Sequence, residues 1–192
     1  MKERPILFSG PMVQAILDGQ KTQTRRVVTN KEFLSWIGVG FSDEFIKLPE
    51  NHWSEKCPYG QPGDRLWVRE TWAEKDEGVA YRATPPKACW GNTKWKPSIF
   101  MPRWASRITL EITDVRVERL KDMTADDALC EGISREIRTR MGWASEESEE
   151  SFNFFESRHT FSLLWNSINE KRGYGWDTNP FVWVIEFRMI QA

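Results

Sequence analysis

The sequence predicts one α+β domain, a small and strongly bent β-barrel of about five or six strands with helices against its ends. Three observations favour this fold class. Residues 6–9 read as a strand, and a helical pattern follows them at once. Residues 106–119 alternate as one long strand whose apolar face changes at Asp114, which indicates a bulge or sharp bend in the wall of a small barrel. Residues 181–188 are apolar on both faces, as expected for a central closing strand.

Length and charge limit the possible classes of protein. A chain of 192 residues can bury a sizeable core, so residues 1–192 are expected to form a single domain. No apolar run approaches the roughly 18 residues of a membrane helix, and we expect a cytoplasmic protein with no membrane partner. The formal net charge is −1 and the pI is about 6.2. Duplex-binding domains have a pI above about 9, so affinity for long nucleic acid should be modest.

The first predicted elements lead into a polar stretch. Pro11 suits the first turn of a helix, and Gly19 is expected to close that helix in the left-handed conformation. If a strand follows, Thr22, Thr24 and Arg26 share one of its faces, because side chains alternate along a strand.

The middle of the chain is predicted to contain few regular elements. Residues 30–62 mix aromatic side chains with Gly, Pro and Asn, which predicts a long irregular insertion ending in a turn. Residues 65–69 alternate as a half-buried strand, and residues 79–82 predict a short one. Residues 85–102 show no clear period.

Two helices are predicted in the second half. Thr124 is expected to cap the first, with Asp127 completing a capping-box-like pair. The Ser- and Glu-rich residues 135–150 predict a second insertion, a loop or linker. The buried side of the first helix is expected to comprise Ala128, Leu129 and Ile133. The second helix has an apolar stripe expected to lie in the core, formed by Phe161, Leu164, Trp165 and Ile168.

The most informative motif is Gly-Gln-Lys-Thr-Gln-Thr-Arg-Arg at residues 19–26. Its pattern Gly-x-Lys-x-x-Thr-x-Arg resembles the signature of the ASCH (activating signal cointegrator homology) domain, a relative of the PUA RNA-binding fold. Further elements resemble the family at residues 63–68, 124–133 and 181–188. The segment at residues 96–107 is similar to that of the longer ASCH proteins of bacteriophages and prophages. By its pattern alone, the first motif also fits an ordinary helix, glycine cap and polar edge strand.

The resemblance implies a set of site residues. In its Lys-Thr motif the chain is similar to ASCH amidohydrolases that act on N4-acetylcytidine, which implies Lys21, Thr24 and Glu131 as the catalytic set. Arg26 would bind substrate oxygen atoms or stabilise an oxyanion. A threonine hydroxyl is a weak nucleophile that needs a neighbouring base, and a lysine can serve only if burial lowers its pKa toward neutrality.

Other interpretations of these residues stay open. Glu131 fits a solvated position near a helix end, and Asp126 and Asp127 are alternative acids. Lys21 and Arg26 could instead hold a phosphate or a base without any reaction.

A second group of residues interleaves aromatic rings and cations. Trp95, Arg103, Trp104 and Arg107 are predicted to bind substrate, together with Trp90, Lys94 and Lys96, because stacked rings and nearby cations are what proteins use on single-stranded nucleic acid. The alternative is a tryptophan-rich loop packed across one end of the barrel. Glu70, beside Trp72, is a further candidate for the pocket.

These observations leave three functions open. The leading one is recognition of RNA or a modified nucleoside, with metal-independent hydrolysis of an N4-acylated cytidine. The others are a ribonuclease for single-stranded RNA and a non-catalytic RNA-binding module. The expected partner is RNA, a nucleoside or a nucleotide, and no cofactor is expected. A zinc site using His52, Cys57 and Cys89 lacks the usual ligand spacing, so no metal is expected either. The oligomeric state stays open.

Overall fold

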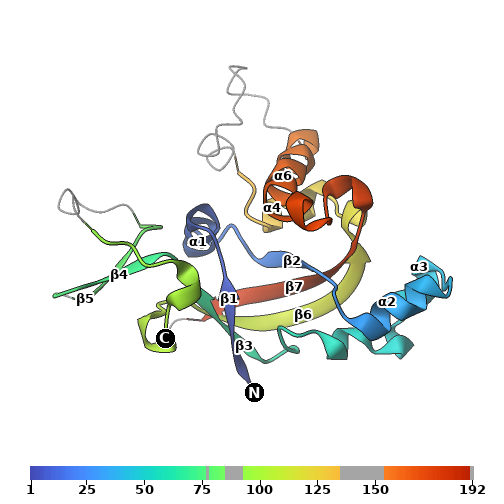
Figure 1. The fold of residues 1–192 in the computed structure, drawn as a ribbon, viewed down its shortest axis with the longest axis horizontal. Coiled ribbons are helices and arrows are strands. Elements are labelled where there is room, and N and C mark those ends of the chain that lie inside the picture. The colour runs from blue at the N-terminus through green and yellow to red at the C-terminus, as the bar shows by residue number, and fades with distance from the viewer. Residues whose placement is uncertain (77, 85–92, 135–153, 191–192) are drawn as a thin grey trace.

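The fold is built on a bent, five-stranded sheet with helices around it (Figure 1). The computed structural model describes residues 1–76, 78–84, 93–134 and 154–190. The strand order is β1-β3-β6-β7-β2, with β1 parallel to β3 and the other neighbours antiparallel. The strands are β1 (Glu3–Leu7), β2 (Gln23–Val27), β3 (Arg65–Arg69), β6 (Thr109–Arg119) and β7 (Phe181–Ile190).

The predicted α+β class with flanking helices is confirmed, but the sheet is not closed into a barrel. Among the described residues β1 and β2 are the two edges, and no strand ladder joins them. Their contact is instead a side-chain hydrogen bond, in which Arg26 donates to the carbonyl of Leu7 over 2.9 Å. The two edges therefore leave a seam that backbone pairing does not fill.

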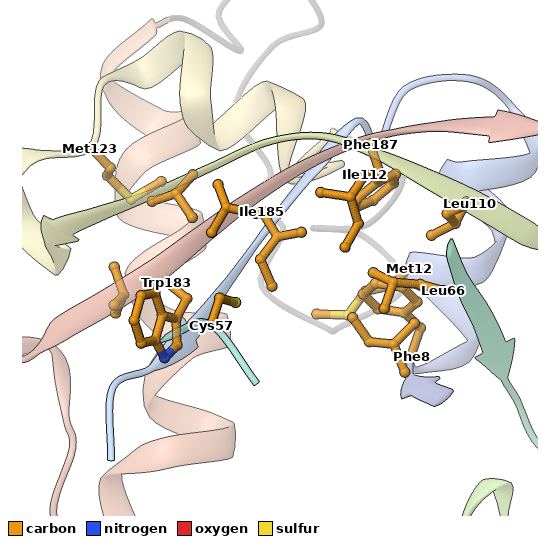
Figure 2. Close-up of a cluster of buried hydrophobic side chains, with 14 of the residues drawn as sticks. Phe8, Met12, Cys57, Leu66, Leu110, Ile112, Met123, Trp183, Ile185 and Phe187 are labelled. Carbon is orange, nitrogen blue, oxygen red and sulfur yellow. The ribbon is translucent and has the colours of Figure 1, made fainter. Parts of the chain in front are cut away.

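The bend lies where the sequence predicts it. The pairing of β6 with β7 shifts register between Ile112 and Asp114, so Thr113 is the extra residue of a bulge. Before the bulge Ile112 lies opposite Phe187, and after it Val115 lies opposite Ile185. All four side chains are buried (Figure 2 labels three of them), so the bulge keeps apolar residues of β6 against the core on both sides of the bend.

The inner strand β7 is central, as predicted from its two apolar faces. It lies between β6 and β2, and its residues from Phe181 to Ile185 are all buried. The prediction that this strand closes a barrel is wrong, because the sheet is open between β1 and β2.

Three helices lie close to the β2 end of the sheet (Figure 1): α1 (Gly10–Leu17), α4 (Ala125–Cys130) and α6 (Phe154–Asn169). Gly19 has a φ of +72° and closes α1 as predicted, and Thr124 and Asp127 form the predicted capping box of α4. The prediction that Leu129 and Ile168 lie in the core is wrong, because their side chains are 42% and 49% exposed. Each lies at the edge of its helix's apolar stripe, where the sequence period alone does not decide burial.

The segment 30–62 is not irregular. It contains α2 (Lys31–Gly38) and α3 (Asp43–Ile46), followed by 3-10 turns at Pro49–Asn51 and Trp53–Lys56. Asn30 and Ser42 cap the two helices, and the ring of Phe33 is completely buried against Trp53 and Phe181. Contact with the sheet thus stabilises short helices that the Gly-rich sequence does not predict.

A separate hairpin of β4 (Trp72–Lys75) and β5 (Gly78–Tyr81) lies at the opposite end of the molecule from α2 and α3 (Figure 1). The sequence predicts only its second strand. Trp72 forms a small second core with Met101 and Ala105, which belong to the short 3-10 segment after the hairpin. The remaining 3-10 turns are Ser98–Phe100, Arg103–Ala105, Leu120–Asp122, Glu170–Arg172 and Trp176–Thr178.

None of the helices described here is both long and apolar enough to cross a bilayer.

Candidate functional site

Lys21 lies just before β2, at the place where the chain passes from α1 into the sheet. It forms an isolated antiparallel bridge with Glu131 at the end of α4, and the amide of Thr22 donates to the carbonyl of Cys130 over 2.8 Å. The side chain of Lys21 has no exposed area. The turn after Gly19 therefore brings together two residues that are 110 positions apart.

The ammonium of Lys21 has a full set of acceptors. Its Nζ donates to the Gln23 carbonyl over 2.7 Å, to the Glu131 carbonyl over 2.8 Å and to the Glu131 Oε2 over 2.7 Å. Burial lowers the pKa of Lys21 below its ordinary value, and the charge of Glu131 acts in the opposite direction. The geometry is that of a charged, fully bonded lysine.

Thr24 does not share a hydrogen bond with Lys21. Thr24 lies opposite Ile185, and residues opposite each other in an antiparallel pair share a face, so its side chain is on the core side of the sheet. It is 1% exposed, and none of the three acceptors of the Lys21 ammonium is its hydroxyl. The structure thus joins Lys21 to Glu131 directly and leaves Thr24 as a neighbour.

The other face of β2 carries a buried guanidinium that sequence analysis did not select. Arg25 has no exposed side-chain area and lies within 3.4 Å of carboxylate oxygens of Glu118, Asp127 and Glu131. Asp127 and Glu131 are one helical turn apart on α4, so both face β2. Glu131 is therefore shared by two cations, Lys21 and Arg25.

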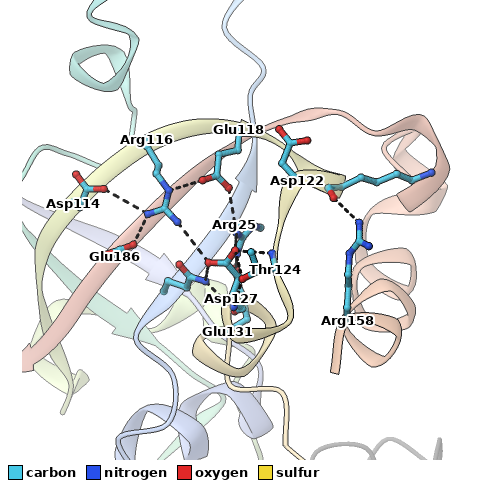
Figure 3. A network of polar contacts seen from close by, with 12 residues as sticks. Arg25, Asp114, Arg116, Glu118, Asp122, Thr124, Asp127, Glu131, Arg158 and Glu186 are labelled. Carbon is cyan, nitrogen blue, oxygen red and sulfur yellow. Dashed lines mark hydrogen bonds and ion pairs between the residues drawn. The ribbon is translucent and has the colours of Figure 1, made fainter. Parts of the chain in front are cut away.

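Arg116 extends this network along the sheet (Figure 3). Its guanidinium pairs with Glu118 and Glu186, and lies 3.6 Å from both Asp114 and Asp127. Burial opposes the charged form, but the hydrogen bonds that Arg116 donates to Glu118 and Glu186 raise the pKa of Arg116 above its ordinary value. The network fixes α4, and with it Glu131, relative to β2, β6 and β7.

Gly132 allows this close approach. Its φ is +85°, and a Cβ built there would lie 2.8 Å from the Ala15 Cβ and 3.0 Å from the Lys21 Cβ. Only glycine fits a positive φ and this contact together.

A cavity of about 560 Å³ opens at the seam between β1 and β2. Glu131 and Arg26 line it, whereas Lys21 and Thr24 do not. Lys21 lies behind the wall, with its Nζ 5.4 Å from the ring centre of Phe8, and Arg26 lies 5.3 Å from the same ring. The cavity wall combines aliphatic, aromatic and polar side chains. The aliphatic part includes Ile6, Leu7, Val27, Leu164 and Ile168, the aromatic part is Phe8, Tyr59, Phe161 and Trp165, and the polar part includes Ser9, Thr71, Ser98, Asn169 and Arg172.

The second predicted group is divided between bonded and exposed residues. Arg103 pairs with Glu3 over 3.1 Å, and Arg107 makes two hydrogen bonds, of 2.8 and 3.0 Å, to the buried carboxylate of Glu70. Trp95 is half-buried, but Trp104 is 65% exposed. Arg107 and Glu70 thus bind each other, and Glu70 does not line the cavity.

Trp104 is one of three exposed apolar side chains between residues 99 and 104. The other two, Ile99 and Phe100, are 58% and 69% exposed, and the preceding residue Ser98 lines the cavity. The edge of Trp104 meets Trp72, with ring centres 5.8 Å apart. Trp90 lies outside the described residues.

Neither a metal site nor a disulfide is present in the part of the chain that the structure describes. No group of three or more His, Cys, Asp or Glu side chains is arranged to hold a metal there, and Cys57 and Cys130 are free thiols. Burial raises the pKa of the Cys57 thiol, so it is a core residue of low reactivity. Cys89 lies outside the described residues.

One sequence signal could have revealed the missed residues. Gln23 and Arg25 alternate with Thr24 and Arg26, and β6 has Arg116 and Glu118 on one face after the bulge. These four charged or polar side chains recur at period two on the two strands that flank β7, which predicts a polar face that a helix with two acids one turn apart could cover.

Comparison with known proteins gives little further information. No protein-family model matches the sequence, and no curated protein matches it. The high-resolution crystal structure of an ASCH domain from Lactobacillus crispatus JV V101 is similar to this chain, with a TM-score of 0.42 and 14% sequence identity. That match covers 100% of this chain and 81% of the other. A likeness of this strength carries no conclusion about the site or its ligand.

Proposed function

We propose that this protein binds a nucleoside, free or as part of single-stranded RNA, in the cavity at the β1–β2 seam. The observation that supports this most is the lining: aromatic rings beside guanidinium groups in a space of about 560 Å³. Ligand cavities commonly measure about 300–1,000 Å³, and nucleobases bind by stacking on aromatic or guanidinium planes.

Membership of the ASCH family is part of this proposal. It is supported by the Gly-x-Lys-x-x-Thr-x-Arg motif at residues 19–26, whose lysine and final arginine lie 5.4 and 5.3 Å from the ring centre of Phe8, which lines the cavity. The resemblance to the longer phage and prophage proteins rests on residues 96–107 and is likewise part of the proposal.

Binding is tested by isothermal titration of the purified protein with cytidine, N4-acetylcytidine and a short single-stranded RNA. An Arg26→Gln variant should weaken binding, because Arg26 lines the cavity and lacks a carboxylate partner among the described residues. The matched control is Arg188→Gln, which removes an equally charged but exposed side chain that pairs with Glu111. Absence of binding for all three ligands would reject the proposal.

Hydrolysis of an N4-acylated cytidine is the second candidate. It is favoured by a buried lysine of lowered pKa bound to Glu131, which faces the cavity. In this geometry Glu131 is the group within reach of a ligand, and Lys21 holds it. For Thr24 to act as nucleophile, its hydroxyl would have to gain a contact with Lys21 when substrate binds.

Release of acetate from N4-acetylcytidine tests this candidate. Glu131→Gln should abolish release while leaving nucleoside binding within a fewfold of the wild type, because the amide keeps the shape of the side chain. Release by Glu131→Gln at the wild-type rate would exclude this mechanism. The same preparations, incubated with single-stranded RNA and a chelator, test the ribonuclease alternative, for which Arg26 is the candidate phosphate-binding cation.

A further inference from the structure

Seven arginines of the described residues pair with carboxylates, whereas two that line the cavity do not. Arg4, Arg25, Arg103, Arg107, Arg116, Arg119 and Arg188 all form ion pairs. Arg26 donates only to the carbonyls of Arg25 and Leu7. Arg172, at the end of the turn after α6, is exposed and has no hydrogen bond or ion pair with the residues that the structure describes.

The acidic side chain of the same cavity cannot balance these two charges. Among the lining residues the carboxylate is that of Glu131, and both of its oxygens already accept from cations, one from Lys21 and one from Arg25. Arg25 is in turn balanced by Glu118 and Asp127. The cavity therefore presents two uncompensated guanidinium groups, one from each of two separate elements.

We propose that the ligand of this cavity carries a phosphate group, which Arg26 and Arg172 bind while the base or sugar lies against the aromatic wall. This inference rests on the proposed nucleoside binding and specifies its ligand as a nucleotide. Guanidinium groups form paired, charge-assisted hydrogen bonds with phosphate oxygens, and in a partly enclosed site such bonds are stronger than in water. A neutral nucleoside would leave both charges unmatched.

Paired titrations test the phosphate directly. Wild-type protein should bind cytidine 5′-monophosphate about tenfold or more tightly than cytidine. Arg172→Gln should remove most of this preference, so that the ratio of the two affinities falls toward one. Because Arg172 is exposed and makes no hydrogen bond or ion pair with the described residues, this variant should melt close to the wild-type temperature.

Lys171→Gln is the matched control. Lys171 is the preceding residue and is also exposed, but it does not line the cavity. Its replacement by Gln removes one positive charge, as Arg172→Gln does. It should keep the wild-type preference for the monophosphate. An equal loss in Lys171→Gln and Arg172→Gln would mean that the effect is general electrostatics, and would overturn the assignment of Arg172.

The outcomes separate this inference from the proposal on which it rests. If cytidine and its monophosphate bind equally, nucleoside binding stands and the phosphate site is rejected. If neither ligand binds, both fail. A short RNA with a 5′-hydroxyl identifies the source of the phosphate: dependence of its binding on Arg172 would indicate an internal phosphodiester, and dependence for the monophosphate alone would indicate a free nucleotide.

Discussion

Lys21 is a buried charge whose position depends on one carboxylate and two carbonyls. A buried ion pair contributes little net stability compared with apolar residues, but removal of one partner leaves the other charge without compensation. Glu131 has a second cation in Arg25, at 3.4 Å, so the loss of Lys21 should be partly compensated. The pair therefore holds the carboxylate of Glu131 in a fixed position in the cavity wall.

Lys21→Met should lower the free energy of unfolding by about 3 kcal/mol, near the lower end of the range for a broken buried pair. Adding Glu131→Gln to the same chain should restore part of that loss, because the unpaired carboxylate is gone. Urea denaturation followed by tryptophan fluorescence measures both. Equal stability of wild type and Lys21→Met would show that the ammonium is replaceable by packing alone.

Trp104 should contribute to binding and not to folding, because it is 65% exposed. If RNA bases stack on it, Trp104→Ala should weaken binding of single-stranded RNA by about 1–3 kcal/mol, with a melting temperature close to that of wild type. Trp104→Phe should retain most of the affinity, whereas Trp104→Leu should not. Fluorescence anisotropy with a labelled RNA gives the three values, and identical affinities would exclude stacking at this residue.

At the scale of elements, the close approach of α1, α4 and β2 depends on two glycines with different surroundings. Gly19 and Gly132 both have positive φ, of +72° and +85°. A Cβ at Gly19 would meet nothing within 4 Å, whereas one at Gly132 would meet Ala15 and Lys21 at 3.0 Å or less. The first glycine is thus required by backbone conformation alone, and the second also by packing.

Gly132→Ala should therefore cost about 3 kcal/mol of stability and Gly19→Ala about 1 kcal/mol. The first variant should also weaken ligand binding, because α1 or Lys21 must move away from Glu131. Chemical denaturation and titration of the two variants side by side measure this difference. Equal losses of stability would mean that α1 shifts freely to accommodate the methyl group.

At the scale of the whole molecule, folding links pH to the polar network. Burial alone would raise the pKa of Asp127. The hydrogen bonds from Gln23 and Thr124 and the charge of Arg25 outweigh burial and hold this pKa below its ordinary value. The hydrogen bonds from Arg119 lower the pKa of Asp43 in the same direction. Carboxyls of this kind bind more protons in the unfolded chain, so their stabilisation is present above about pH 4 and is lost as the pH falls through their folded pKa values.

The melting temperature should accordingly fall steeply below about pH 4. The Asp127→Asn variant should be less stable than wild type at neutral pH, and its melting temperature should fall less as the pH is lowered. Asp126→Asn is the matched control, because Asp126 is exposed and makes no hydrogen bond or ion pair with the described residues. Thermal denaturation across the pH range gives the comparison. Parallel curves for wild type and Asp127→Asn would show that other groups dominate acid unfolding.

The salt dependence of RNA binding should be shallow, because the chain has a formal net charge of −1 and seven arginines of the described residues pair with carboxylates. Two or three phosphate contacts on a single strand give a log–log slope of roughly −1.5 to −2. Arg172→Gln should make this slope less negative, and Trp104→Ala should leave it unchanged. A wild-type slope several times steeper, with tight duplex binding, would indicate a continuous basic track in place of a cavity.

Local rules in the sequence determined the ends of α1 and α4, the bulge near Asp114 and the inner position of β7. Each of these features depends on residues that are close together in the chain. The end of α1 depends on a glycine with positive φ, the start of α4 on a capping residue three positions before an acid, and the bulge on a change in the alternation of apolar residues. The sequence also selected Lys21, Thr24 and Glu131 as a set, although their roles stay a prediction. Pattern alone could not predict the helices of residues 30–62, because burial of Phe33 against the sheet, and not propensity, stabilises them.

Only the tertiary structure decided which charges meet. The open seam, the joining of Lys21 to Glu131 with Thr24 left aside, and the burial of Arg25 among three carboxylates all depend on contacts between distant segments. The same holds for Arg172, which no sequence pattern singled out. The sequence does not specify which carboxylates lie near each cation in the folded chain. A cation without a carboxylate partner at a cavity is free to pair with a negatively charged ligand, whereas a cation already bound to carboxylates is not.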